Sequence, residues 1–388
     1  MPSRPERVLI TGARAPVALH MARLLAGAGC YVVIADSLRH CIGYASSACQ
    51  THEILPPFDS RVHVLCDAVQ AIIHRHEITH ILPTCEEVLY LARAVEMGDC
   101  DAQFIAPCLR LLQAAHNKAS FIELAQEVGL TVPETRLLTS SNDVAALDLP
   151  SDHYVFKPVW SRFGTQVLIK PDDFRISPTK EQPWIAQNYL SGPLNCAYAV
   201  ADRGRVTALA IYEPRYPAGR GGGTAFLPVI DDSITDQVTR FIAQTNWTGQ
   251  ISFDFIKTED GPRPIECNPR ATSGLHLFED GPDFAGALFD GQVIKPKAQG
   301  LHGVRSAMAF FGGWRALRSG GWGWFIRDLR SVTDVIADPG DPAPARQQWR
   351  ALFEFAWLAS RRRISLQAAS TYDIAWNGPD STAPYVSE

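Results

Sequence analysis

Residues 249–276 hold acidic and amide side chains at positions suited to binding a metal ion. Large apolar residues alternate with small or acidic ones on both sides of a Thr-Glu-Asp-Gly-Pro turn, which is the pattern of a β-hairpin. A loop with an odd number of residues, centred on Asp260, places Asp254 opposite Glu266, because paired residues of antiparallel strands share one face. A loop with an even number places the two acids on opposite faces.

Asn268 lies two residues beyond Glu266 on the same predicted face, and Arg270 follows it. Two carboxylates and an amide oxygen form the hard oxygen site that Mg²⁺ requires when it also holds nucleotide phosphates. A solvated hairpin with an acidic outer face is the alternative interpretation of this stretch taken alone.

The order of Asp254 and then Glu266-Cys267-Asn268-Pro269-Arg270 resembles the metal-binding end of the ATP-grasp superfamily. The resemblance is to its carboxylate–amine ligases and to proteins like biotin carboxylase and carbamoyl phosphate synthase. It implies that Asp254, Glu266 and Asn268 bind Mg²⁺, or Mn²⁺ in its place, between the phosphates of ATP. It also implies that Arg270 is catalytic and faces the transferring phosphoryl group.

Four further residues match the parts of this family that contact ATP phosphates. Lys118 opens a Lys-x-x-Phe segment before a predicted helix, and Lys157 lies in a predicted strand. Only seven of the 36 basic residues are lysines, so chance rarely places one at each motif position. Residues 160–165 occupy the position of the phosphate-clamping loop, and Ser161 and Arg162 are expected to contribute because this loop has only one glycine.

Residues 184–190 resemble the interdomain strand that lines the adenine pocket of the family. The resemblance places Gln187 near the adenine amino group and the backbones of Asn188 and Leu190 at the adenine edge. The family also has an acid after the next glycine, where this chain has Asn195, and we assign Asn195 to the nucleotide as well.

Four of the five residues from 219 to 223 are glycines, which predicts a mobile flap over the site. Arg215 and Arg220 are expected to grip a carboxylate or an acyl phosphate, with Arg215 in a catalytic role. A disordered hairpin tip is the alternative for this stretch.

The composition is that of a soluble globular protein, with 388 residues, 46% hydrophobic and 20% charged residues. The net charge of −5 provides no basic excess for a nucleic-acid partner. The nine cysteines show no CxxC spacing, which favours reduced thiols in the cytoplasm over zinc or disulfides. We expect no signal peptide and no transmembrane segment.

The order of elements predicts an α/β protein, and the resemblance implies that it has three parts. These are a Rossmann-like pre-ATP-grasp domain (1–115), an α+β ATP-grasp domain (116–295) and a C-terminal cap (296–388). The predicted strands of the first part are 8–10, 31–36, 62–65, 81–84 and 104–106. Dinucleotide binding, with Asp36 at the ribose, is a weak alternative because the turn after Gly12 lacks the other glycines of the motif.

The cap is predicted to contain a strand at 304–311 and a helix at 346–363. Its residues 312–363 hold five of the nine tryptophans, beside basic residues. Such a composition is found in membrane-interface segments, but aromatic residues more often pack in cores and interfaces. We therefore expect the cap to pack its aromatics on the ATP-grasp domain. Residues 371–377 suggest no function.

The resemblance implies a cytoplasmic enzyme that uses ATP to activate a small carboxylate as an acyl phosphate, which an amine then attacks. Three alternatives remain open at this point. They are another ATP-grasp chemistry such as carboxylation or phosphorylation, a non-catalytic ATP-binding protein, and an NAD-dependent enzyme. A homodimer is compatible with the sequence.

Overall fold

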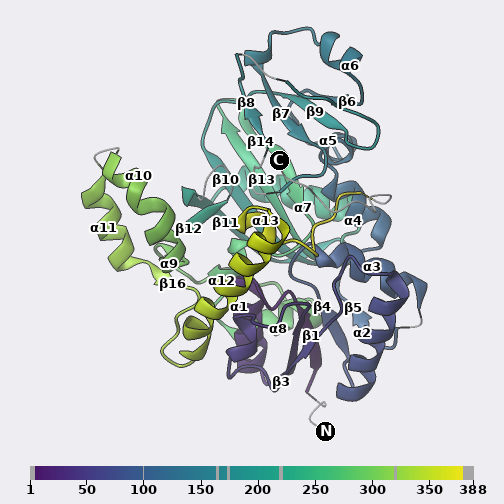
Figure 1. Ribbon diagram of the computed structural model, residues 1–388, viewed down its shortest axis with the longest axis vertical. Helices are drawn as coiled ribbons and strands as arrows, with labels where there is room; N and C mark the ends of the chain where they lie inside the picture. Colours follow the sequence, from purple (N-terminus) through teal and green to yellow (C-terminus); the bar gives the residue numbers. More distant parts are fainter. Residues whose placement is uncertain are drawn as a thin grey trace.

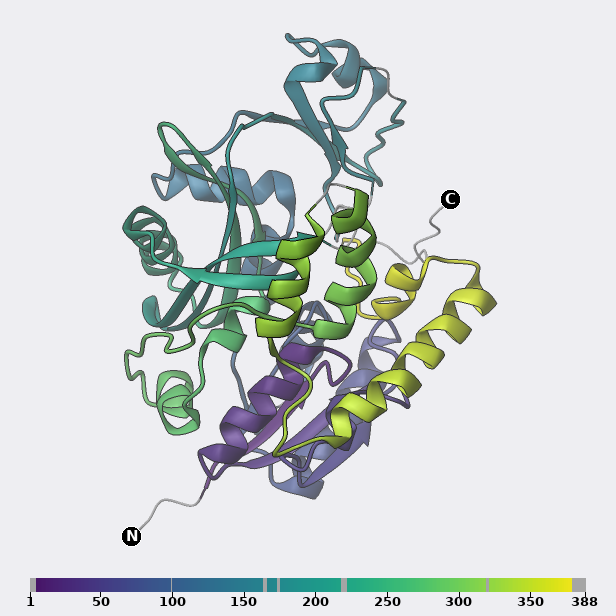
Figure 2. The same ribbon diagram turned by 90° about the vertical axis from the view of Figure 1, so that its left-hand side faces the viewer.

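The computed structural model describes residues 5–98, 100–162, 166–172, 175–217, 222–318 and 321–378. These residues form three β-sheets. Figure 1 shows the parallel sheet at the bottom, the smallest sheet at the top and the largest sheet between them. Figure 2, turned by 90° about the vertical axis, shows the C-terminal helices on the side of the molecule that faces the viewer.

The first sheet is parallel, with the strand order β3-β2-β1-β4-β5, as predicted for a Rossmann-like part. Its strands are β1 (Arg7–Thr11), β2 (Tyr31–Asp36), β3 (Thr51–Ile54), β4 (His80–Leu82) and β5 (Gln103–Phe104). Its helices are α1 (Pro16–Gly27), η1 (Gly43–Ala45), α2 (Val62–His76), α3 (Glu87–Met97) and α4 (Leu109–His116). Alternation along β1 sends Leu9 toward α2 and α3, and Val8 and Ile10 toward α1.

The prediction of a strand at 62–65 was wrong, because these residues begin α2. Leu65, Val69, Ile72 and Ile73 are buried on one face at helical spacing, so the helix buries this apolar set as a stripe. A four-residue apolar run fits either period, and the third strand is the more polar segment β3.

Asp36 is not available to a ribose, which contradicts the dinucleotide alternative. It is fully buried, and the guanidinium of Arg14 donates to its carboxylate at 2.5 Å. Arg14 also donates to Asp373 at 2.9 Å. The two acids therefore share one buried arginine, which ties the C-terminal segment to the first sheet.

A four-stranded antiparallel sheet, with the order β6-β9-β7-β8, forms the top of the molecule. Its strands are β6 (Thr135–Leu138), β7 (Tyr154–Pro158), β8 (Leu168–Ile169) and β9 (Trp184–Asn188). Three short or medium helices accompany it: α5 (Lys118–Glu127), α6 (Ser141–Ala145) and η2 (Ser151–His153). The predicted positions of Lys157 and Gln187 on strands are confirmed.

The largest sheet has the order β14-β13-β10-β11-β12-β15-β16. Its strands are β10 (Leu194–Asp202), β11 (Arg205–Pro217), β12 (Gly223–Val229), β13 (Gly249–Thr258), β14 (Gly261–Asn268), β15 (His302–Gly303) and β16 (Thr333–Asp334). Its helices are α7 (Asp232–Thr245), η3 (Ser273–Leu277) and α8 (Gly281–Phe289). Phe253 and Phe255 are fully buried in the core shared with α5 and α7, so Asp254 between them faces the opposite side.

The C-terminal part is helical, and two predictions for it were wrong. Its helices are α9 (Arg305–Ala307), the π-helical turn η4 (Met308–Gly312), α10 (Gly313–Arg318), α11 (Trp322–Ser331), α12 (Ala343–Arg362) and α13 (Leu366–Ser370). Residues 304–311 form no strand, because Met308 packs with Ala225 and Phe325 in a small helical core. The aromatics of the cap are packed only in part: Phe325 and Trp376 are buried, whereas Trp324, Trp349 and Trp357 are exposed.

We predict that Asp373→Ala lowers the free energy of unfolding by about 1–3 kcal/mol, because Arg14 loses one of its two buried carboxylate partners. Urea denaturation measures the change, and hydrogen exchange of residues 366–378 localises it. The control is Asp260→Ala, whose side chain is 87% exposed at the hairpin turn. Equal stability of the two variants would contradict the role given to the shared arginine.

Candidate active site

The β13–β14 hairpin pairs Asp254 with Glu266, but not through the loop that the sequence suggested. Thr258 pairs with Gly261, so the loop between them has two residues, which is an even number. Such a loop alone would place the two acids on opposite faces. Ile265 is an extra residue between two paired positions, and this β-bulge restores the register that brings the carboxylates together.

A cavity of about 770 Å³ lies over this hairpin. Eleven of the predicted site residues line it, which is the main agreement between sequence and structure. They are Lys118, Lys157, Ser161, Arg162, Gln187, Asn188, Leu190, Asp254, Glu266, Asn268 and Arg270. The predicted phosphate loop and flap lie partly outside the described residues, at 163–165 and 218–221, and so does Arg220.

The two lysines reach the cavity from different elements. Lys118 is 2% exposed at the start of α5, where the Asn117 side chain caps the helix. Its ammonium donates to the Ser161 carbonyl at 2.7 Å and lies 3.3 Å from Glu266. Lys157 donates to the Gln187 amide oxygen at 3.0 Å, and burial lowers the pKa of this lysine to about 8.

The paired acids create a concentrated negative charge beside these lysines. Burial, and then the neighbouring Glu266 carboxylate, raise the pKa of Asp254 to about 6. A cation that neutralises both carboxylates relieves this repulsion. Among the described residues no three His, Cys, Asp or Glu side chains gather as a metal site, so a metal here also needs the Asn268 amide and substrate oxygens.

Arg270 lies at the same end of the cavity and positions Asn268. Its Nη2 donates to the Asn268 side-chain oxygen at 3.1 Å, and its Nη1 donates to the Ala271 carbonyl at 3.1 Å. Its buried Nε has no hydrogen-bond partner among the described residues. A buried guanidinium donor without a partner favours an anionic oxygen of a ligand.

Two predicted residues do not line the cavity. Arg215 forms an ion pair with Glu213 at 2.9 Å, whereas Tyr212 and Pro214 of the same strand line the cavity. Alternation therefore sends the Arg215 side chain to the other face. The side chain of Asn195 also points away from the cavity because of strand alternation. It is buried and pairs with Phe255 on the face opposite Asp254, so its assignment to the nucleotide is corrected.

Sequence reasoning missed Glu86, which lines the cavity from the first sheet. Burial would raise its pKa, but the Arg162 guanidinium at 3.0 Å, together with His116, Arg270 and the backbone of Trp376, lowers the pKa of Glu86 to about 2. The backbone N–H of Trp376 donates to the same carboxylate at 3.2 Å. Residues 371–377, for which the sequence suggested no function, thus help to close the site.

The cavity lining includes a set of apolar side chains, which we call the apolar half. Six side chains from η4, α12, the C-terminal segment and nearby elements line it. They are Phe226, Val304, Ala307, Phe311, Phe355 and Ile374. Arg14 and Glu86 at its edge already bind partners of opposite charge. The lining therefore combines these apolar side chains with the charged residues around the hairpin.

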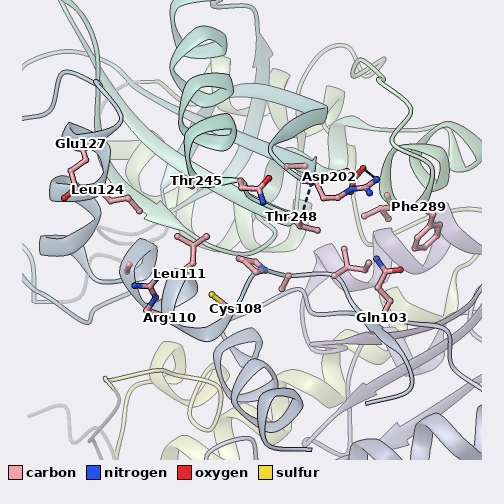
Figure 3. Close-up of a pocket in the computed structure, with 18 residues that line it drawn as sticks. Gln103, Cys108, Arg110, Leu111, Leu124, Glu127, Asp202, Thr245, Thr248 and Phe289 are labelled. Carbon is pink, nitrogen blue, oxygen red and sulfur yellow. Dashed lines mark hydrogen bonds and ion pairs between the residues drawn. The ribbon is translucent and has the colours of Figure 1, made fainter. Parts of the chain in front are cut away.

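A second and larger hollow, of about 1040 Å³, lies near α4 and the β10–β11 turn (Figure 3). None of the predicted site residues lines it. Arg203 at its edge is paired with Asp202 at 3.0 Å, and the hollow has no opposed carboxylates like those of the hairpin. We therefore assign the chemistry to the smaller cavity.

The comparison with solved structures shows that the fold of this chain is similar to that of several ligases and carboxylases. The L-amino acid ligase from Bacillus licheniformis shares 16% identity over 70% of this chain and 68% of its own, with a TM-score of 0.53. The ADP complex of N5-carboxyaminoimidazole ribonucleotide synthetase shares 12% identity over 81% of this chain and 85% of its own, with a TM-score of 0.61.

The biotin carboxylase domain of the Hydrogenobacter thermophilus 2-oxoglutarate carboxylase, in complex with MgADP, ADP and bicarbonate, is also similar. It shares 13% identity over 76% of this chain and 71% of its own, with a TM-score of 0.55. No protein-family model and no curated protein sequence matches the chain. The likeness is therefore one of fold.

We predict that the protein takes up protons when it binds a nucleotide at about pH 8. At about pH 6.5 the same binding should take up far fewer protons. At the higher pH about half of the Lys157 side chains are neutral, and bound phosphates raise the pKa of this lysine, so binding protonates it. At the lower pH the lysine is already charged. Calorimetry in buffers of different ionisation enthalpy measures the uptake.

The matched variants are Lys157→Met, which should lose the uptake, and Lys180→Met at an exposed lysine, which should keep it. Equal uptake by both variants would show that Lys157 does not face the phosphates.

Proposed function

We propose that the protein is an ATP-dependent ligase that activates a carboxylate as an acyl phosphate and couples it to an amine. The observation that carries this proposal is the convergence of the Asp254–Glu266 pair, Lys118, Lys157 and Arg270 on one cavity of the ATP-grasp fold. We also propose the division into parts at 1–115, 116–295 and 296–388.

In this proposal Asp254, Glu266 and Asn268 hold Mg²⁺, which would supply charge neutralisation between the ATP phosphates. The opposed carboxylates and the raised pKa of Asp254 fit a cation at this position. Lys118 and Lys157 hold phosphate oxygens, and Gln187 orients Lys157 through its hydrogen bond. Arg270 stabilises the charge of the transferring phosphoryl group.

The reaction then has two displacements. A carboxylate oxygen of the acid attacks the γ-phosphorus, the bond from that phosphorus to the bridging oxygen breaks, and ADP leaves. The amine nitrogen attacks the acyl carbon, the carbon–oxygen bond to phosphate breaks, and the amide, phosphate and a proton are released. Binding of the acid beside Arg270 supplies the alignment on which both steps depend.

The apolar half of the cavity supports a substrate with an aliphatic or aromatic group. Phe311, Phe355 and Ile374 line this half, and the charged residues at its edge are already paired. A second charged group on the substrate would enter without a counterion, which is costly. Among candidate acids and amines, those with apolar side chains are therefore expected to react best.

The test measures ADP release with a panel of carboxylates, each with and without amines. We expect ADP release that depends on both the carboxylate and the amine. We also expect an amide product, which mass spectrometry detects. Release with bicarbonate alone, or with the acid and no amine product, would indicate another chemistry of this fold. Nucleotide binding without turnover against the whole panel would indicate a non-catalytic protein.

We predict that Asp254→Asn and Glu266→Gln each lower the rate of ADP release by about a hundredfold or more. The reason is that each substitution removes one of two opposed carboxylates. Glu259→Gln in the turn of the same hairpin is the control, because this residue is exposed. Circular dichroism checks the fold, and full activity in both acid variants would exclude the metal assignment.

A second pair of variants separates the two arginines. Arg270→Ala should lower the rate of ADP release by roughly a hundredfold, since Arg270 lines the cavity and has an unpaired buried donor. Arg215→Ala should change it by less than about threefold, because its side chain pairs with Glu213 on the other face. A larger loss for Arg215 than for Arg270 would reverse this assignment.

A further inference from the structure

Helix α12 exposes large aromatic side chains on one face. Trp349 is 63% exposed, Phe353 is 74% exposed and Trp357 is 58% exposed. A spacing of four residues places these three rings in one row along the helix. The opposite side buries Ala351 and packs Phe355 against the main core. The helix is therefore amphipathic, but its outer face is aromatic.

Arginines flank this aromatic row, and the helix's one acid is turned away from it. Arg346, Arg350 and Arg361 are exposed, and the Arg361 guanidinium lies 5.2 Å from the centre of the Trp357 ring. The Glu354 carboxylate accepts hydrogen bonds from backbone N–H groups of the first sheet's loop, at 2.8 and 3.2 Å. The outer face of α12 thus combines aromatic rings with positive charge.

Helix α11 repeats this combination. Trp324 is 68% exposed, and the Arg327 guanidinium lies 4.3 Å from the centre of its ring. The one acid of this helix, Asp328, accepts a hydrogen bond from Tyr216 at 2.6 Å and so faces the large sheet. Figure 2 shows α11 and α12 on the side of the molecule that faces the viewer.

The charge of this region differs in sign from that of the whole chain. Residues 305–363 contain ten arginines and five acidic residues, whereas the chain has a net charge of −5. Positive charge is therefore concentrated where the exposed aromatics are. A surface of this kind attracts a partner that is negatively charged and accepts aromatic rings.

We propose that the exposed aromatic and arginine side chains of α12, together with those of α11, form an aromatic–arginine face that docks on a membrane surface containing anionic lipids. Tryptophan and phenylalanine rings enter the boundary between headgroups and acyl chains, and arginines pair with lipid phosphates. Among the described residues no helix is long and apolar enough to cross a membrane. The contact proposed is peripheral.

Other occupants fit the face less well. A second copy bound through a two-fold axis would bring arginines opposite arginines, which opposes association. A single-stranded nucleic acid binds in a charged groove with stacking platforms, whereas this row lies on the outer side of a helix. A membrane matches both the convex shape and the mixture of apolar and positive groups.

The test uses the full chain and vesicle flotation. Vesicles of phosphatidylcholine alone are compared with vesicles that contain about one-third phosphatidylserine. We expect binding to the anionic vesicles, weakened by salt, and quenching of tryptophan fluorescence by brominated lipids. The triple variant Trp349→Ala, Phe353→Ala and Trp357→Ala should bind about tenfold or more weakly.

A charge variant, Arg346→Gln with Arg350→Gln, should lose most of the preference for anionic vesicles and tests the same face without removing aromatics. The controls are Ile230→Ala, at a 94% exposed apolar residue, and Arg203→Gln, at an 82% exposed arginine. Unchanged binding in both face variants would overturn the proposal. Absence of vesicle binding would also overturn it. In that case sedimentation would show whether the face mediates dimerisation, and an oligonucleotide binding assay would show whether it binds nucleic acid; neither result would rescue the proposal.

Discussion

The site depends on two carboxylates held against each other on neighbouring strands. Like charges at opposed positions destabilise a sheet, so this arrangement persists only where other interactions fix it. Phe253 and Phe255 hold the strand face through the core, and the bulge at Ile265 sets the register. Lys118, 3.3 Å from Glu266, offsets part of the charge. Burial and the remaining repulsion raise the pKa of Asp254, which is the physical basis of the proposal that this pair binds a cation.

The sequence predicted this pair correctly although its reasoning about the loop was wrong. Alternation identified both acids and the face of Asp254, because the flanking phenylalanines are local signals. The turn length and the bulge compensate each other, and neither has a distinctive local pattern here. Arg215 and Asn195 were assigned wrongly because their neighbours at 214 and 196 line the cavity, and only the structure shows which face of each strand this is. The prediction of a strand at residues 62–65 was wrong because a short, mainly apolar run fits either a strand or a helix.

Contacts between distant segments were beyond the reach of local patterns. Glu86 meets Arg162 and the backbone of Trp376, which brings together residues up to 290 positions apart. Arg14 likewise joins Asp36 to Asp373. The sequence assigned Arg162 to the phosphate loop and considered Asp36 for a ribose, and no local pattern indicated that these residues pair with Glu86 and Arg14. Burial turns them into paired groups, because an unpaired charge in such a position is costly. The C-terminal segment therefore belongs to the site through long-range electrostatics.

Helix α12 shows why its aromatics were assigned to the wrong surroundings. Aromatic residues usually stabilise cores, so the sequence favoured packing of the whole set on the ATP-grasp part. The helix instead divides them. Phe355 lines the apolar half of the cavity, while Trp349, Phe353 and Trp357 lie on the other side of the same helix. Burying that outer row against the sheet would require turning Glu354 and Phe355 outward, with loss of the hydrogen bonds to the first sheet and of the cavity wall. The inner contacts determine the helix rotation, and the exposed aromatic row is its consequence.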